Sequence, residues 1–103
     1  MRVSVRYEWD DVKREQKLAK HGLAFDDARL VYESPLKWDF RSPRAREEDR
    51  RQAFAFVFTA QAVCVLVYAA RGDSVRCISF RKASKREREQ YDEFLGTDRQ
   101  LHE

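Results

Sequence analysis

Residues 79–88 of this chain read Ser79-Phe80-Arg81-Lys82-Ala83-Ser84-Lys85-Arg86-Glu87-Arg88. They follow an apolar run with β-branched residues at positions 75–78, which is typical of a strand. Ser84 and Glu87 then have the spacing of a capping box, in which a Ser hydroxyl and a Glu carboxylate satisfy the free amide groups at a helix start. The stretch therefore predicts that a strand ends and a helix begins here.

The same stretch is strongly basic, with five cations and one anion. Because the first turn of a helix favours anions, cations placed there do not serve helix stability alone. They suit the binding of a phosphate group, and a solvated basic surface is the alternative. Residues 89–103 are acidic by contrast. A basic patch beside an acidic segment points to an anionic partner such as nucleic acid.

The length of 103 residues fits one domain, which we expect to span residues 1–96, followed by a frayed C-terminal tail at 97–103. No apolar run approaches the roughly 20 residues of a membrane helix, and the N-terminus lacks the apolar core of a signal peptide. We therefore expect a cytoplasmic protein with no membrane contact. Cys64 and Cys77 are expected to be reduced, buried thiols in strands.

Apolar periodicity predicts five strands and three helices. The strands are expected at residues 2–8, 36–40, 53–59, 63–70 and 74–80. The helices are expected from Asp10 or Asp11 to His21-Gly22, from Asp26 to Glu33, and from Ser84 to Leu95, ending before Gly96. Short links among the later strands indicate an antiparallel meander flanked by helices. The predicted fold class is α+β, with two N-terminal helices, an antiparallel sheet and a C-terminal helix.

The side chains that could take part in catalysis or ligand binding are mostly cations. Metal ligands are poorly placed, since His21 and His102 are far apart and neither cysteine neighbours them, so we expect no metal and no cofactor. Three glycines cannot build a Gly-rich phosphate loop. A set of Arg, Lys, His and Tyr suits RNA cleavage without metal, in which a ribose 2′-OH attacks the adjacent phosphate.

Individual candidates follow from this chemistry. Arg76 and Arg81 would point to opposite faces of a straight strand, so we expect a bulge or a strand end near Phe80 that lets them converge. The further catalytic candidates are Lys82, Arg71, Arg86, His21 as proton carrier and Tyr91 as phenol. The residues expected to contact RNA are Lys13, Lys20, Lys85 and Arg88.

Each candidate also has a structural alternative. The cations could be ordinary surface charge, and His21 could stabilise the end of a helix. The Tyr91 ring could pack on the sheet while its hydroxyl finds a partner. The aromatic side chains Phe54, Phe56 and Phe58 could belong to the core or dock a partner protein.

Two blocks of the chain resemble the BrnT-type toxins. The first block is Tyr7-Glu8-Trp9-Asp10, then Lys13, then Lys20-His21-Gly22-Leu23-x-Phe25. The second is Arg76-x-Ile78-Ser79-x-Arg81-Lys82-Ala83-Ser84, followed by Glu87 and Tyr91. The chain departs from the family at Phe80, where a small residue, commonly Ala, is usual.

The resemblance implies a ribonuclease toxin of a type II toxin–antitoxin pair, with a fold similar to RelE toxins. Such toxins cut RNA and stall translation, and a tightly bound antitoxin, itself a DNA-binding protein, silences them. The sequence leaves two alternatives to an active endoribonuclease: a toxin-like module that binds without cleaving, and a basic structural domain. The oligomeric state stays open between a homodimer and a toxin–antitoxin heterotetramer.

Overall fold

The computed structural model describes residues 5–11, 23–43 and 49–101, with side chains up to Gly96 in the last helix. Its strands are β1 (Arg6–Glu8), β2 (Trp38–Arg41), β3 (Arg50–Val57), β4 (Ala62–Arg71) and β5 (Ser74–Lys82). Its helices are the short 3-10 helix η1 (Phe25–Asp27), α2 (Ala28–Tyr32) and α3 (Lys85–Leu101). The α+β class is therefore confirmed, whereas the helix predicted to end at His21-Gly22 lies almost entirely outside the described residues.

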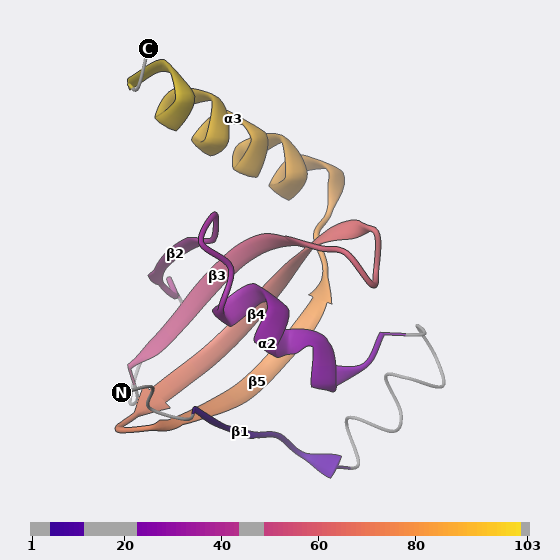
Figure 1. Cartoon of the computed structure of the whole chain (residues 1–103), viewed down its shortest axis with the longest axis vertical. Coiled ribbons are helices and arrows are strands. Elements are labelled where there is room, and N and C mark those ends of the chain that lie inside the picture. Colours follow the sequence, from indigo (N-terminus) through magenta and orange to yellow (C-terminus); the bar gives the residue numbers. More distant parts are fainter. Residues whose placement is uncertain (1–4, 12–22, 44–48, 102–103) are drawn as a thin grey trace.

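The five strands form one sheet in the order β1-β5-β4-β3-β2 (Figure 1). Strands β2 to β5 form the expected antiparallel meander, but β1 pairs with β5 in parallel. The antiparallel meander is therefore confirmed for β2 to β5, and the sheet as a whole is corrected to a mixed one by the parallel β1 edge. The short turn at Gly72 (φ +58°) forces β4 and β5 to run in opposite directions. No such turn links β1 to β5, because most of the chain lies between them.

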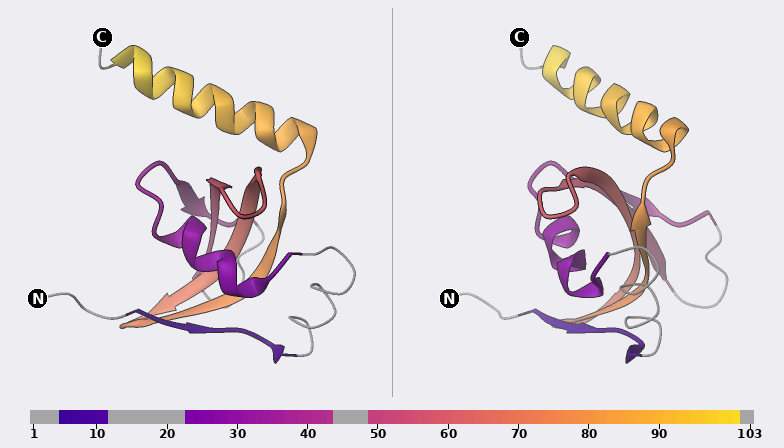
Figure 2. Two further views of the ribbon diagram at one scale, coloured as in Figure 1. Left: turned by 45° about the vertical axis from the view of Figure 1, so that its right-hand side comes forward. Right: turned by 90° about the vertical axis from the view of Figure 1, so that its right-hand side faces the viewer.

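One face of the sheet is covered by η1 and α2, which lie within its curve (Figure 2). Phe25, Ala28 and Val31 are buried there among side chains of β3, β4 and β5. Cys64 and Cys77 are also buried on this face, as predicted, and burial raises the pKa of the Cys77 thiol to about 11. We call this side of the sheet the α2 face.

The opposite side, the α3 face, is covered at one end by the C-terminal helix. Tyr91 and Phe94 of α3 pack there with Phe54, Val65 and Trp38, and the Trp38 and Phe94 rings stack at 5.4 Å. No helix in the described part of the chain is long and apolar enough to cross a membrane.

The start of α3 confirms the predicted capping box. The backbone N–H of Ser84 donates to Glu87 Oε1 at 2.9 Å, and the Glu87 N–H donates to Ser84 Oγ at 3.2 Å. The helix end was predicted wrongly, because α3 continues through Gly96 to Leu101. Gly96 lies in open space and is helical, so nothing there requires the left-handed backbone that would end the helix.

Strand β5 contains the predicted irregularity. Val67 of β4 lies opposite Ser79, and its neighbour Tyr68 lies opposite Cys77, so Ile78 is an extra residue in β5. Such a bulge reverses the alternation of the residues that follow it. Phe80 therefore joins the buried core of the α2 face, and Arg81 points to the other side.

Candidate functional site

Partners in neighbouring strands share a face, so the strand register maps the α3 face row by row. Beneath α3 lie the pair Phe56 and Val63 and the row Trp38, Phe54, Val65 and Arg81. The next row holds Phe40, Gln52, Val67 and Ser79. The third holds Arg50, Ala69, Arg76 and Glu8. The face thus changes from apolar beneath α3 to charged at its far end.

A hollow of about 240 Å³ lies at this charged end. It is lined by Glu8, Ala69, Arg71, Ser74 and Arg76, and we call it the arginine hollow. Two guanidinium groups and one carboxylate therefore share a single small space around a buried alanine. Arginine forks bind phosphate oxygens in pairs, and a carboxylate can accept a proton, so this combination suits a reacting phosphodiester.

Register explains how these residues meet. Glu8 of β1 is the partner of Arg76 in the parallel pairing, and Arg71 is the partner of Ser74 across the β4–β5 turn. Arg50 of β3 lies on the other side of Ala69 from Arg76. No cluster of three His, Cys, Asp or Glu side chains that could hold a metal occurs within the described residues.

Arg81, the leading candidate from sequence, lies elsewhere and is engaged in an ion pair. Its two terminal nitrogens donate to both carboxylate oxygens of Glu87, at 2.6 and 2.8 Å. This pairing, together with the bonds to Ser84, lowers the pKa of Glu87 to about 2. Arg81, near the end of β5, is thus matched by the carboxylate of the capping box, and the ion pair joins β5 to α3.

The bulge brings Arg76 and Arg81 to one face, as predicted, without bringing them together. Arg81 lies opposite Val65 and Arg76 lies opposite Ala69, four residues apart along β4. At about 3.3 Å per residue, roughly 13 Å separates the two positions. Arg71 lies farther still from Arg81, so these arginines form two groups and do not converge on one phosphate.

The other predicted residues are dispersed. Lys82 is exposed at the end of β5, opposite Cys64 of the α2-face core, and Arg86 is exposed on the first turn of α3. Tyr91 is 2% exposed, and its hydroxyl donates to the Leu36 carbonyl at 2.8 Å, which is the packing role named as its alternative. The remaining three candidates lie outside the described residues: Lys13, Lys20 and His21.

Lys85 and Arg88 line a second hollow, of about 410 Å³, at the opposite end of the α3 face from the arginine hollow. They share it with Phe56, Val63 and two carboxylate residues of α3. Lys85 and Arg88 therefore lie at a different site from the arginine hollow.

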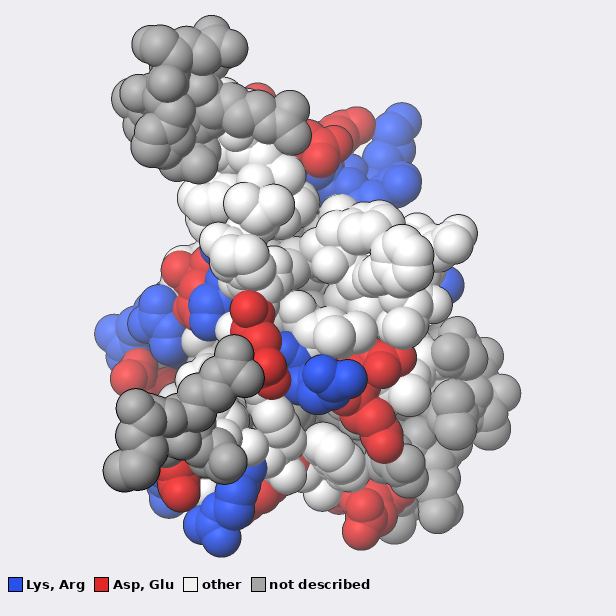
Figure 3. Space-filling view, viewed as in Figure 1, with Lys and Arg blue, Asp and Glu red and all other residues white. Residues whose placement is uncertain are grey.

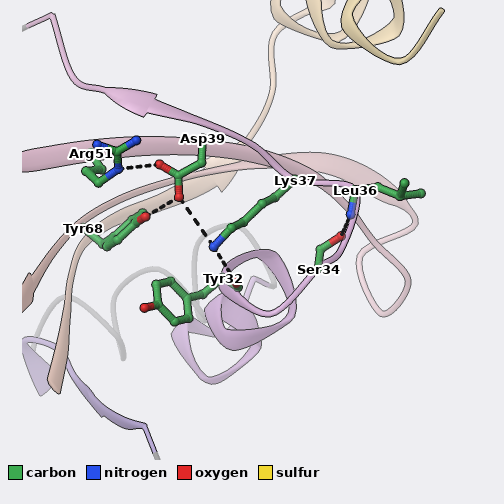
Figure 4. A network of polar contacts seen from close by, with 7 residues as sticks. All are labelled: Tyr32, Ser34, Leu36, Lys37, Asp39, Arg51 and Tyr68. Carbon is green, nitrogen blue, oxygen red and sulfur yellow. Dashed lines mark hydrogen bonds and ion pairs between the residues drawn. The ribbon is translucent and has the colours of Figure 1, made fainter. Parts of the chain in front are cut away.

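A polar network on the α2 face was not predicted (Figure 4). Asp39 accepts hydrogen bonds from Arg51 Nε at 2.7 Å and from the Tyr68 hydroxyl, and it lies 3.5 Å from Lys37 Nζ. Lys37 also donates to the Tyr32 carbonyl at 2.8 Å. Burial and the Asp39 carboxylate raise the pKa of Tyr68. Because both Asp39 oxygens are engaged, the network serves to hold β2, β3 and β4 together.

Sequence reasoning also missed Glu8 and Arg50. Glu8 stands inside the Tyr7-Glu8-Trp9-Asp10 block, which was the available signal for it. Arg50 is one of two adjacent arginines, and only the register shows which of them faces the arginine hollow side of the sheet.

Comparison with known proteins identifies the family of this chain. The family model described as "Ribonuclease toxin, BrnT, of type II toxin-antitoxin system" matches residues 9–87, which is most of the chain. No single curated protein matches it well enough to be reported as a relative. Membership implies an RNA target and an antitoxin partner. The chain belongs to the BrnT family of ribonuclease toxins of type II toxin–antitoxin systems.

Proposed function

We propose that this chain is an endoribonuclease that cuts RNA at the arginine hollow and thereby inhibits translation in the cytoplasm. The observation that carries the proposal is the pairing of Glu8 with Arg76 inside a hollow that also contains Arg71. Cleavage by a ribose 2′-OH requires a proton acceptor, groups that bind the phosphate and a proton donor for the leaving oxygen, and the hollow contains the first two.

The proposed reaction is a transesterification. Glu8 takes the proton from the 2′-OH, and the 2′ oxygen attacks the adjacent phosphorus. The bond from phosphorus to the 5′ oxygen breaks, and that oxygen leaves with a proton from an acid. The products are a 2′,3′-cyclic phosphate and a 5′-hydroxyl. Arg76 and Arg71 stabilise the charge that develops on the phosphate oxygens, because guanidinium forks bind two oxygens at once.

His21 is the proposed proton donor to the 5′ oxygen. An imidazole has an ordinary pKa near 6.5, so it can carry a proton at neutral pH. Lys13 and Lys20, in the same segment of sequence, are proposed to guide the RNA chain. These three assignments rest on the sequence alone, since the residues lie outside the described ranges.

The proposed chemistry uses guanidinium charge where other nucleases use a metal. Within the arginine hollow, Glu8 is the one carboxylate among the described lining residues, against two arginines. Divalent metal sites are usually built from several oxygen ligands, whereas an arginine pair suits a phosphate directly. We further propose that the sheet and its C-terminal helix are a RelE-like arrangement.

The ends of the RNA products test the reaction. The purified chain is incubated with a labelled RNA in excess EDTA, and the termini are identified by mass spectrometry. The proposal expects cleavage that persists in EDTA and leaves 2′,3′-cyclic phosphates with 5′-hydroxyls. Cleavage that requires Mg²⁺ and leaves 5′-phosphates would contradict the mechanism. RNA binding without any cleavage would favour a binding module instead.

A further inference from the structure

Three large apolar side chains are exposed around the tip of the β3–β4 hairpin and the loop before β2. Leu36 is 59% exposed, Phe56 is 53% exposed and Phe58 is 78% exposed. Figure 3 shows an area free of charged residues at the hairpin, below the start of α3. Exposed apolar patches of this kind mark protein interaction sites, because water is displaced from them on binding. We call these three residues the apolar patch.

Tyr91 contacts the backbone at two of the three residues of the apolar patch. Its buried hydroxyl bonds to the Leu36 carbonyl at 2.8 Å and also lies close to the backbone of Phe56. Phe58 begins the turn that follows β3, where Gln61 N–H donates to the Phe58 carbonyl at 3.1 Å. The apolar patch therefore rests on an ordered scaffold and requires little rearrangement to receive a partner.

The second hollow adjoins the apolar patch and shares Phe56 with it. Its charged residues come from the first turns of α3 and carry both signs: Lys85, Arg88, Glu89 and Asp92. Its remaining lining residues are Gln61, Ala62 and Val63. Apolar side chains beside charges of both signs resemble the boundary between the core and the rim of a protein–protein interface.

We infer that the apolar patch and the second hollow together form the docking surface for the antitoxin. Membership of a type II toxin–antitoxin family implies an antitoxin partner. The exposed apolar side chains and the mixed charges are the features that would bind such a protein. The antitoxin would insert an apolar side chain beside Phe56 and place charged residues opposite Lys85 and Asp92. RNA is disfavoured as the occupant, because Glu89 and Asp92 balance the charges of Lys85 and Arg88 and leave the hollow no net positive charge to attract phosphates.

The position of this surface has a consequence for regulation. Val63, which lines the second hollow, lies six residues along β4 from Ala69 of the arginine hollow. At about 3.3 Å per residue this separation is roughly 20 Å. Antitoxin binding and RNA cleavage therefore depend on different residues, and single substitutions can separate them.

Direct binding measurements test the inference. The probe is the purified cognate antitoxin, titrated calorimetrically without RNA. Phe58→Ser is expected to weaken its binding by about 30-fold or more, as for a central aromatic residue of an interface. Phe58→Leu, which keeps an apolar side chain, and Arg29→Ser, on the exposed side of α2, are expected to bind nearly as the wild type does.

The inference is independent of the cleavage chemistry, because binding is measured without a substrate. Folding of each variant is checked by thermal melting, and Phe58 is exposed enough to be replaced without loss of the core. Unchanged antitoxin affinity in Phe58→Ser would overturn the inference. The inference would also be overturned if Phe58→Ser lost RNA binding, or changed the oligomeric state measured by light scattering, while it still bound the antitoxin as the wild type does.

Discussion

Glu8 of β1 and Arg76 of β5 are partners in the parallel strand pairing, and both line the arginine hollow. The two residues are far apart in sequence, yet the pairing places a carboxylate and a guanidinium side by side. The short β1 strand thus contributes directly to the proposed site as well as to the edge of the sheet. We propose that Glu8 transfers the proton and that Arg76 binds the phosphate.

Glu8→Gln should slow RNA cleavage with little loss of RNA affinity. The amide keeps the size of the side chain but cannot accept the 2′-OH proton, and general base catalysis is worth about 10²–10⁴-fold. Single-turnover cleavage rates and RNA binding, measured separately, distinguish the two effects. Glu93→Gln, on an exposed part of α3, is the matched control. An unchanged rate in Glu8→Gln would remove Glu8 from the reaction.

Glu87 should make the stability of the protein sensitive to acid. Its pKa is lowered to about 2 in the folded protein, mainly because Arg81 donates to it. A lowered pKa stabilises the fold above the ordinary glutamate pKa, and that stability is lost as pH falls from about 5 towards 2. Glu87→Gln keeps a side chain that can cap the helix but removes its charge. Its free energy of unfolding should be lower than that of the wild type by about 1–2 kcal/mol at neutral pH, a modest loss because the ion pair is partly exposed.

The measurement for Glu87 is urea unfolding of wild type and variant between pH 7 and pH 2. The two free energies of unfolding should converge as the pH approaches 2. Glu89→Gln, which neutralises a neighbouring exposed residue of the same helix, should show no such convergence. A constant difference across the whole range would mean that the ion pair with Arg81 does not stabilise the fold.

Phe80→Ala should destabilise the fold without opening the site. Phe80 is 0% exposed and packs on the α2 face against Phe25, on the opposite side of the sheet from the arginine hollow. Removing a buried aromatic ring costs about 3–5 kcal/mol, whereas Phe80→Leu should cost less. Denaturant unfolding measures the loss. Faster RNA cleavage by a fully stable Phe80→Ala would show that the ring obstructs the site.

Tyr91→Phe should have a small effect on stability and none on cleavage. The substitution removes one hydrogen bond, from the Tyr91 hydroxyl to the Leu36 carbonyl, worth about 0.5–1.5 kcal/mol. The ring itself stays in the cluster beneath α3. Thermal melting and cleavage assays on the same preparation provide the check. A large loss of cleavage with an unchanged melting temperature would show that the Tyr91 hydroxyl takes part in catalysis.

Local signals in the sequence predicted local structure well. The capping box of Ser84 and Glu87 marked the start of α3, and the odd spacing of Arg76 and Arg81 led to the expected bulge in β5. Both features depend on residues within a few positions of one another. The end of α3 was missed because a glycine permits the left-handed backbone but does not require it.

Long-range pairing could not be predicted in the same way. Nothing near Glu8 indicates that β1 lies parallel to β5, so its proximity to Arg76 is visible only in the fold. The role of Arg81 was interpreted from its charge, yet its partner is Glu87, six positions along the chain. A basic stretch at a helix start can serve a bound phosphate or an internal carboxylate, and only geometry distinguishes them.

The measurement that tests the central claim most directly is RNA cleavage by Arg76→Gln, with Arg29→Gln as the exposed arginine control. Removing one group that stabilises charge in the transition state typically costs about 10²–10³-fold in rate. The account predicts a loss of this size in Arg76→Gln with an unchanged melting temperature, and wild-type cleavage by Arg29→Gln. Wild-type cleavage by a folded Arg76→Gln would contradict the assignment of the arginine hollow as the active site.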